Sequence, residues 1–223
     1  MERWHALGNV YLLTEEPLDA HQVRAAALDA DGIVQVTARG DDWAEVVIWN
    51  TDGSTSEMSG NATRIVAAWL EADTTRVRVG AREVVARRTR DGRIEQDLGA
   101  VAVSKPERIA GLDVVRVDVG NPHAVVIGEP GELPRIGPEL ETHPAFPERT
   151  NVQVARIDAP GRVTARVWER GVGETSASGT SAVAVAAATH GDGEVVVSFP
   201  GGDLLVRLAG GRAFLTGPAE RLG

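Results

Sequence analysis

Two segments of this 223-residue chain can be laid on each other without a gap. They read VIWNTDGSTSEMSGNATRIVAAWL at residues 47–70 and RVWERGVGETSASGTSAVAVAAAT at residues 166–189. In each segment a tryptophan precedes a Ser-Gly pair by ten residues, from Trp49 to Ser59 and from Trp168 to Ser178. An internal repeat constrains the architecture more than any single motif does. We therefore predict a chain of two similar halves.

Each repeated segment predicts a strand, a polar loop and a helix, because small helix-forming residues follow each Ser-Gly pair. Downstream of both helices, turn signals such as Asp91-Gly92 and Pro200-Gly201-Gly202 separate short apolar runs, which is typical of hairpins. The prediction is an α+β fold with two pseudo-symmetric domains, each a curved, mainly antiparallel sheet wrapped around a central helix. The alternative is a chance likeness of two α+β segments, since Gly, Ser and Ala are common. The matched tryptophan spacing and the matched hairpins argue against it.

We expect the halves to be residues 1–108 and 109–223, with the active site in the cleft between them. The joint is placed near Val103 to Gly111, where Lys105, Pro106 and Glu107 interrupt the pattern. The pseudo-symmetry then predicts that the helix starts at Ser59 and Ser178 face each other across that cleft.

The composition disfavours several kinds of partner, metal site and cofactor. The net charge of -9 and the pI near 5.1 disfavour nucleic acid and anionic membranes as partners. The absence of cysteine excludes disulfides, thiolate metal sites and thiol nucleophiles. The five histidines show no metal-ligand spacing, and the single lysine, Lys105, is poorly placed for a pyridoxal phosphate Schiff base. We expect no metal and no cofactor.

Neither a leader segment nor an apolar run of membrane-spanning length is evident in the sequence, so we expect a cytoplasmic protein. The expected partner is a small amino-acid substrate, without nucleic acid or membrane. A homodimer is one assembly that the sequence permits.

A Ser-Gly pair at a helix start presents unpaired backbone N–H groups and the positive end of the helix dipole, which suits a carboxylate. Starts at Ser59-Gly60-Asn61 and Ser178-Gly179-Thr180 that converged on one amino-acid carboxylate would also stabilise the carbanion left by loss of the adjacent Cα proton. Taken alone, each serine is an ordinary N-cap. The functional interpretation rests on the pairing.

Seven sequence blocks, in order, are similar to the signatures of the diaminopimelate epimerase family. They are HALGNVYLL (5–13), NTDGSTSEMSGNATR (50–64), VGNPHAVV (119–126), HPAFPERTNVQV (143–154), WERGVGETSASGTSA (168–182), FPGGDLLV (199–206) and LTGPAE (215–220). The blocks run from end to end of the chain. The same fold also covers proline racemases, but the GNPH, TNV and ERGxGET blocks resemble the diaminopimelate branch.

The resemblance implies a cofactor-independent isomerase that interconverts LL- and meso-diaminopimelate, in lysine and cell-wall precursor synthesis. Two bases on opposite faces of Cα move the proton. The catalytic candidates that the resemblance implies are Ser59, Ser178, His123 and Glu169. The implied substrate-binding residues are Asn9, Asn50, Gly60, Asn61, Asn121, Asn151, Glu169, Arg170, Gly179 and Thr180.

Plainer roles exist for two of these residues. A guanidinium fork suits Arg170 to a distal carboxylate, but a loop ion pair with Glu169 or Glu174 is the structural alternative. His123 follows Pro122 and has a turn-capping role as its alternative.

The chain departs from the family pattern at the bases themselves. The family uses two cysteines, and the matching positions here are Ser59 and Ser178. A serine hydroxyl is a much weaker acid than a thiol, so this sequence should epimerise poorly or not at all. Leu28-Asp29 replaces a glycine-rich stretch before Ala30-Asp31-Gly32, and the chain is shorter than typical relatives.

Engineered replacement and natural divergence both remain explanations of the two serines. Ile65 and Val183 occupy further positions where relatives often hold cysteine, which favours divergence slightly. Two alternatives to a slow epimerase also remain. One is a catalytically silent amino-acid-binding homologue; the other is an isomerase that uses Glu57 or Glu174 as its base.

Overall fold

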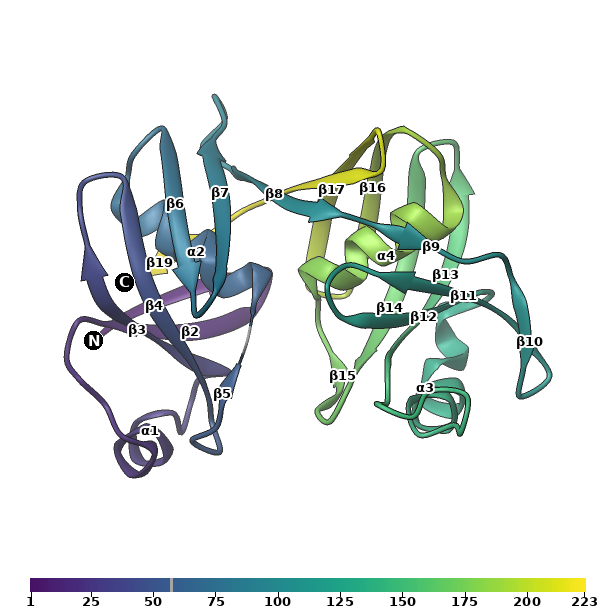
Figure 1. Ribbon diagram of the computed structural model, residues 1–223, viewed down its shortest axis with the longest axis horizontal. Coiled ribbons are helices and arrows are strands. Elements are labelled where there is room, and N and C mark those ends of the chain that lie inside the picture. Colours follow the sequence, from purple (N-terminus) through teal and green to yellow (C-terminus); the bar gives the residue numbers. More distant parts are fainter. Residues whose placement is uncertain (57) are drawn as a thin grey trace. The chain divides into compact units, whose positions relative to one another are not determined.

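The computed structural model describes residues 1–56 and 58–223, so Glu57 lies outside the described residues. Within it the chain forms two compact units, residues 1–97 with 216–223 and residues 98–215. Figure 1 traces both units in sequence colours, from purple to yellow.

The first unit is a sheet of short strands with two helices. Its elements are β1 Glu2–Ala6, β2 Asn9–Thr14, α1 Ala20–Ala26, β3 Gly32–Arg39, β4 Trp43–Asn50, β5 Thr55–Ser56, α2 Gly60–Leu70, β6 Thr74–Val79, β7 Arg82–Arg88 and β19 Glu220–Leu222. The strand β8, Ile94–Ala100, begins in this unit and ends in the second.

The second unit repeats this order. Its elements are β9 Ala102–Val103, β10 Glu107–Ile109, β11 Leu112–Asp118, β12 Pro122–Ile127, the 3-10 turn Pro130–Glu132, α3 Leu133–Glu141, β13 Asn151–Ala159, β14 Arg162–Glu169, β15 Gly173–Thr175, α4 Gly179–Thr189, β16 Gly193–Phe199, β17 Gly202–Ala209 and β18 Arg212–Gly217, the last of which returns to the first unit.

Strand pairing is the same in the two units. The parallel pairs are β2–β3 and β4–β6 in the first unit, and β12–β13 and β14–β16 in the second. The hairpins β3–β4, β6–β7, β13–β14 and β16–β17 are antiparallel. These features confirm the predicted α+β fold with two pseudo-symmetric, mainly antiparallel domains.

The central helices are buried on nearly every side. In α2, residues 60–68 are all buried, and the helix contacts β1, β4, β6 and β7. In α4 the buried residues are mostly alanine and valine, and the helix contacts strands β11 to β14 and β16 to β17. A helix that is buried on nearly every side has to lie inside its domain, so each sheet wraps around its helix.

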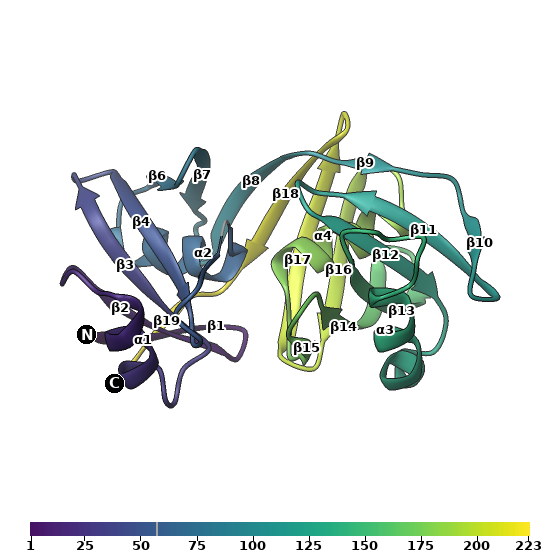
Figure 2. The same cartoon turned by 60° about the horizontal axis from the view of Figure 1, so that its bottom comes forward.

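A second helix covers the other face of each sheet, and Figures 1 and 2 show α1 and α3 apart from the central helices. Val23 of α1 packs on Ile33. Leu133, Ile136 and Leu140 of α3 pack on Val152 and Val154. Strands covered on both faces read as continuous apolar runs, which explains the mixed alternation in the sequence.

The units differ from the predicted halves, 1–108 and 109–223, at two places. The strand β19 at the C-terminus pairs with β1, so Arg3 lies opposite Leu222 in the first unit. The strand β9 pairs with β11, so Val103 belongs to the second unit. These pairings join residues far apart in sequence, which a local break in composition cannot reveal. The predicted cleft stays a prediction.

Among the described residues, no helix has the length and apolar character needed to cross a membrane.

The helix α3 touches its sheet most closely at Gly137. A Cβ added to Gly137 would lie 2.8 Å from Cγ and 2.9 Å from Cβ of Trp168. Gly131, on the preceding turn, faces open space. The helix can therefore approach Trp168 because residue 137 has no side chain.

We predict that Gly137→Ala lowers the free energy of unfolding by about 1 to 3 kcal/mol, the usual cost of overpacking. Gly131→Ala, the matched control, should stay within about 0.5 kcal/mol of the parent. Urea denaturation followed by tryptophan fluorescence measures both. Equal stability of the two variants would contradict the close packing of α3 on Trp168.

Candidate functional site

The start of α2 is formed by Ser59 in extended conformation, with φ -142° and ψ 118°. Its Oγ accepts a hydrogen bond from the backbone N–H of Ala62 at 3.2 Å, as an N-cap does. The same Oγ lies 3.1 Å from the hydroxyl of Tyr11 on β2. A side chain that the sequence left without a role therefore touches the predicted base position.

Asn61 lies in the first turn of α2 and is 5% exposed. Its Nδ2 donates to Oδ1 of Asn9, the first residue of β2. Its Oδ1 accepts from Nη2 of Arg64. The structure thus brings together two of the predicted substrate-binding residues, Asn9 and Asn61, beside the start of α2.

Arg64 is fully buried, and no acidic side chain among the described residues pairs with it. Its Nε donates weakly to the carbonyl of Pro218 at 3.5 Å, and its Nη1 has no hydrogen-bond partner in the described part of the chain. Burial lowers the pKa of Arg64 to about 10, against the opposing effect of Tyr11. An unpaired buried cation is costly, so this half of the site favours an anion.

Asn50 is placed differently from these residues. It is exposed, and its Nδ2 donates to Oγ of Ser54 at 2.9 Å, while its backbone N–H donates to the Ser54 carbonyl. The amide therefore closes the turn after β4. Its role in substrate binding stays a prediction.

The start of α4 repeats that of α2. Ser178 has φ -145° and ψ 131°, close to the values of Ser59, and is 7% exposed. Its hydroxyl makes no cap hydrogen bond to α4. The Ser178 side chain therefore leaves the backbone N–H groups in the first turn of α4, around Gly179 and Thr180, uncapped. Ser59, by contrast, caps α2.

His123 is buried at the start of β12, 1% exposed. Its Nδ1 lies 3.0 Å from Nε2 of Gln153, and its Nε2 lies 3.0 Å from Oδ1 of Asn121. Since the Gln153 amide donates to Nδ1, the ring proton is on Nε2 and donates to Asn121. Burial lowers the pKa of His123 to about 3, Arg170 adds to this, and Gln153 opposes it. The ring is neutral at physiological pH.

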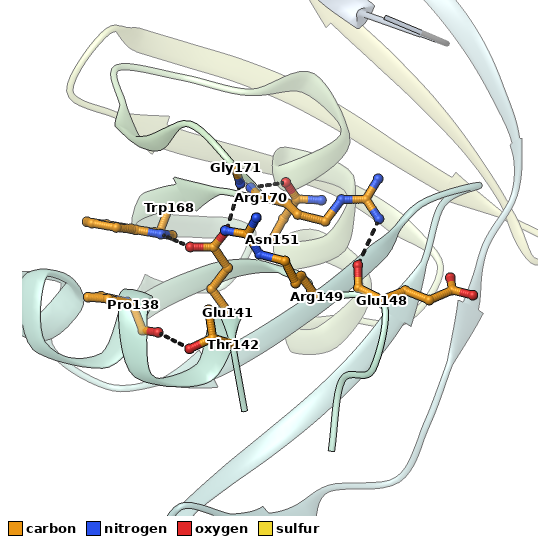
Figure 3. A network of polar contacts seen from close by, with 9 residues as sticks. All are labelled: Pro138, Glu141, Thr142, Glu148, Arg149, Asn151, Trp168, Arg170 and Gly171. Carbon is orange, nitrogen blue, oxygen red and sulfur yellow. Dashed lines mark hydrogen bonds and ion pairs between the residues drawn. The ribbon is translucent and has the colours of Figure 1, made fainter. Parts of the chain in front are cut away.

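The loop that carries Arg170 is held by Asn151 and Glu141, as Figure 3 shows. Oδ1 of Asn151 accepts from the backbone N–H of Arg170 at 3.0 Å, and its Nδ2 donates to the Pro122 carbonyl. The buried Glu141 carboxylate accepts from the Gly171 N–H at 2.6 Å. The loops that carry His123 and Arg170 are thus tied to each other.

Glu141 is also bound by Nε1 of Trp168 at 2.7 Å and by Arg149. Burial raises the pKa of this carboxyl, but the hydrogen bonds from Gly171 and Trp168 and the charge of Arg149 outweigh it, so the pKa is lowered overall. Glu141 remains ionised and fixes the loop through residue 171.

The side chain of Arg170 is exposed and donates from Nη1 to the Glu148 carbonyl at 3.2 Å. Glu174, one ion-pair partner considered for it, binds Arg166 through both carboxylate oxygens at 2.7 Å. Glu169 accepts from Oγ1 of Thr175. A Glu174 engaged by a guanidinium fork is a poor base, which weighs against the alternative chemistry through this residue. Glu57, the other candidate base, lies outside the described residues.

Sequence reasoning missed Tyr11, Arg64 and Glu141. The signal for Tyr11 was present, since Gly8-Asn9-Val10-Tyr11 matches Gly120-Asn121-Pro122-His123. No such signal marked Arg64 as buried, because arginine is almost always exposed. Within residues 1–56 and 58–223 there is no group of three acidic or histidine side chains suited to a metal ion.

Comparison with known proteins gives a consistent result. The sequence model of the family described as "Diaminopimelate epimerase" matches residues 115–222. The diaminopimelate epimerase of Synechococcus elongatus is 34% identical over 266 residues, covering 99% of this chain and 95% of that protein. That of Desulforudis audaxviator is 36% identical over 268 residues, with 99% and 96% covered.

Among solved structures, a predicted epimerase from Pseudomonas aeruginosa has the same fold, with a TM-score of 0.73 at 17% identity. The match covers 100% of this chain and 98% of that one. The alignment with the Synechococcus protein has 266 positions against 223 residues here, so at least 43 positions have no counterpart in this chain. The shortening therefore lies inside the chain.

The neutral, buried His123 predicts a dependence of stability on pH. The unfolded chain binds a proton at this residue as the pH falls through its ordinary value of 6.5, whereas the folded chain does so only near 3. Stability contributed by the neutral ring is complete above 6.5 and is lost as the pH falls toward 3. The loss should approach about 1.4 kcal/mol per pH unit between these values.

Urea denaturation at several pH values between 3 and 7 measures this slope. His123→Gln should flatten it, while His21→Gln, at an exposed histidine, should leave it unchanged. An equal slope in the parent and in His123→Gln would show that the ring is not held neutral.

Proposed function

The chain belongs to the diaminopimelate epimerase family, and on that premise we propose that it binds diaminopimelate and interconverts its LL and meso forms slowly. The observation that carries the proposal is the repeated helix start. Ser59 and Ser178 occupy the N-cap positions of helices of eleven residues at equivalent points of two similar units, with matching backbone angles. These are the positions at which family resemblance puts the two bases.

The reacting carboxylate is proposed to bind to the first-turn N–H groups of α2 and α4. The dipoles of these buried helices favour a negative charge there, and the unpaired Arg64 adds a positive one. Loss of the Cα proton spreads negative charge onto the same carboxylate. The N–H groups would then stabilise the carbanion more than the substrate.

The distal amino-acid end is proposed to bind at the loop of Arg170. The Glu141 network holds the backbone of this loop while the guanidinium is exposed and bonded only to a carbonyl in the described part of the chain. That group remains available for a carboxylate. Asn151 binds both the Pro122 carbonyl, next to His123, and the backbone N–H of Arg170. These two bonds fix the backbone at His123 relative to the backbone at Arg170.

Because serine occupies both base positions, we expect Cα proton transfer to be slow. A hydroxyl supplies far less anion at neutral pH than a thiol whose pKa is lowered at a helix start. The same observation favours a second candidate, a homologue that binds the amino acid without turning it over. Both share the binding site and differ only in Cα proton transfer.

We predict that meso-diaminopimelate binds with heat measurable by calorimetry and that Arg170→Ala weakens binding by about 2 kcal/mol, roughly 30-fold. This is the lower end for loss of one partner of a charge pair, because Arg170 is exposed before binding. Arg170→Lys should recover only part, since lysine lacks the bidentate fork.

Arg135→Ala, which removes an exposed arginine paired with Glu132, serves as the control and should bind like the parent. Unchanged affinity in Arg170→Ala would reject the role of Arg170. Absence of binding by the parent would reject the proposed function.

A further inference from the structure

We infer that Tyr11 and Ser59 form a proton relay, in which the phenol of Tyr11 serves as the base that the Ser59 hydroxyl cannot be by itself. The inference rests on the proposed function, because it needs Ser59 to face the Cα of a bound amino acid. It goes beyond that proposal by naming a group that supplies the basicity missing at position 59.

The contact between the two hydroxyls is the first observation. The Tyr11 hydroxyl oxygen lies 3.1 Å from Oγ of Ser59, within hydrogen-bond distance. Oγ already accepts from the Ala62 N–H. Its own proton can therefore be donated to Tyr11 while the cap to α2 is kept.

The position of the Tyr11 ring is built into the sheet. Tyr11 lies opposite Gly32 in the parallel pair β2–β3, and a Cβ on Gly32 would come within 2.8 Å of Cε1 of the ring. Only glycine leaves room for the ring at this point. Gly32 belongs to the Ala30-Asp31-Gly32 stretch that departs from the family pattern on its N-terminal side.

The second unit places a titratable ring at the equivalent position. His123 lies opposite Asn151 in the parallel pair β12–β13, just as Tyr11 lies opposite Gly32. Gly32 and Asn151 each begin their strand. Both rings come after a Gly-Asn pair, with one residue between the pair and the ring. The fold thus puts one ring at the equivalent position of each unit, and Gln153 links the His123 ring to Ser181 in α4.

A buried positive charge lies near Tyr11. The Arg64 guanidinium is fully buried without an acidic partner among the described residues, and Tyr11 is the group whose charge acts on it. A phenolate at Tyr11 would supply an anion for Arg64. A phenol is also intrinsically far more acidic than an aliphatic hydroxyl, with a reference pKa near 10.

Tyr11 first loses its proton to solvent and becomes a phenolate. The Cα–H bond then breaks, the proton passes to Oγ of Ser59, and the hydroxyl proton of Ser59 passes to the phenolate. The electron pair stays on Cα and spreads into the carboxylate. The Ser59 hydroxyl now carries the former Cα proton. Reversal after this hydroxyl has exchanged its proton with solvent returns a deuterium to the same face of Cα, with retention of configuration.

The test is Cα deuterium incorporation in heavy water, followed by NMR for LL- and meso-diaminopimelate in the parent, Tyr11→Phe, Ser59→Cys and the double variant Tyr11→Phe/Ser59→Cys. Phenylalanine keeps the ring on Gly32 and removes only the hydroxyl. We expect the parent to exchange one stereoisomer. Tyr11→Phe should exchange the same stereoisomer at least about 100-fold more slowly, which is the usual effect of removing a general base. The double variant should exchange as fast as Ser59→Cys, because a thiol does not need the phenol.

Tyr11 is the chain's single tyrosine, so phenolate absorbance reports its ionisation alone. The exchange rate of the parent should rise with pH along the same curve as this absorbance. Calorimetry on every variant measures binding separately.

Equal exchange by the parent and Tyr11→Phe would overturn the relay, as would a parent that binds diaminopimelate but exchanges no Cα proton at any pH. In the first case the proposed function would stand, and in the second only its binding part would, which is the silent homologue. Absence of binding would overturn the proposed function and the relay with it.

Discussion

The buried starts of the two central helices are the constraint on which the rest of the structure depends. Each helix is enclosed by a sheet, so its first-turn N–H groups must find partners inside the protein or in a ligand. Ser59 satisfies one such group on α2, whereas the Ser178 hydroxyl makes no such bond on α4. Two starts with nearly the same backbone therefore differ in what they still offer to an anion.

The groups around these starts are neutral amides and hydroxyls with one buried cation. Asn9 and Asn61 bind each other beside α2, while Asn121 and Gln153 bind the ring of His123, which burial keeps neutral, in the second unit. Arg64 is the buried charge without an acidic partner among the described residues. A buried cation without a paired anion costs stability, so packing alone does not account for Arg64.

The sequence predicted the elements of the site better than their connections. The repeat located both central helices and their caps to the residue, because strand, loop and helix signals are local. The strands β19 and β9 each pair with a strand of the other expected half, and pairing between distant strands leaves no local pattern. Two of the predicted substrate-binding residues use their side-chain amides for other contacts. Asn50 closes its own turn, and Asn151 binds the Pro122 carbonyl and the Arg170 N–H. Residue type and family position indicated a role for these amides but not which neighbour each would bind. Tyr11 was missed because its role depends on a contact with Ser59, which is 48 residues away.

We propose that the chain keeps an epimerase site from which only the thiols are missing. The most direct measurement is epimerisation of LL-diaminopimelate by the double variant Ser59→Cys/Ser178→Cys, followed by chiral chromatography without any cofactor. The parent has no cysteine, so alkylation of this variant is confined to the two new thiols. We predict that this variant forms meso-diaminopimelate at least about 100-fold faster than the parent does, and that this activity is lost on alkylation and protected by substrate. A folded double variant that binds diaminopimelate and forms no meso product would contradict it, and a silent binding protein would then be the better description.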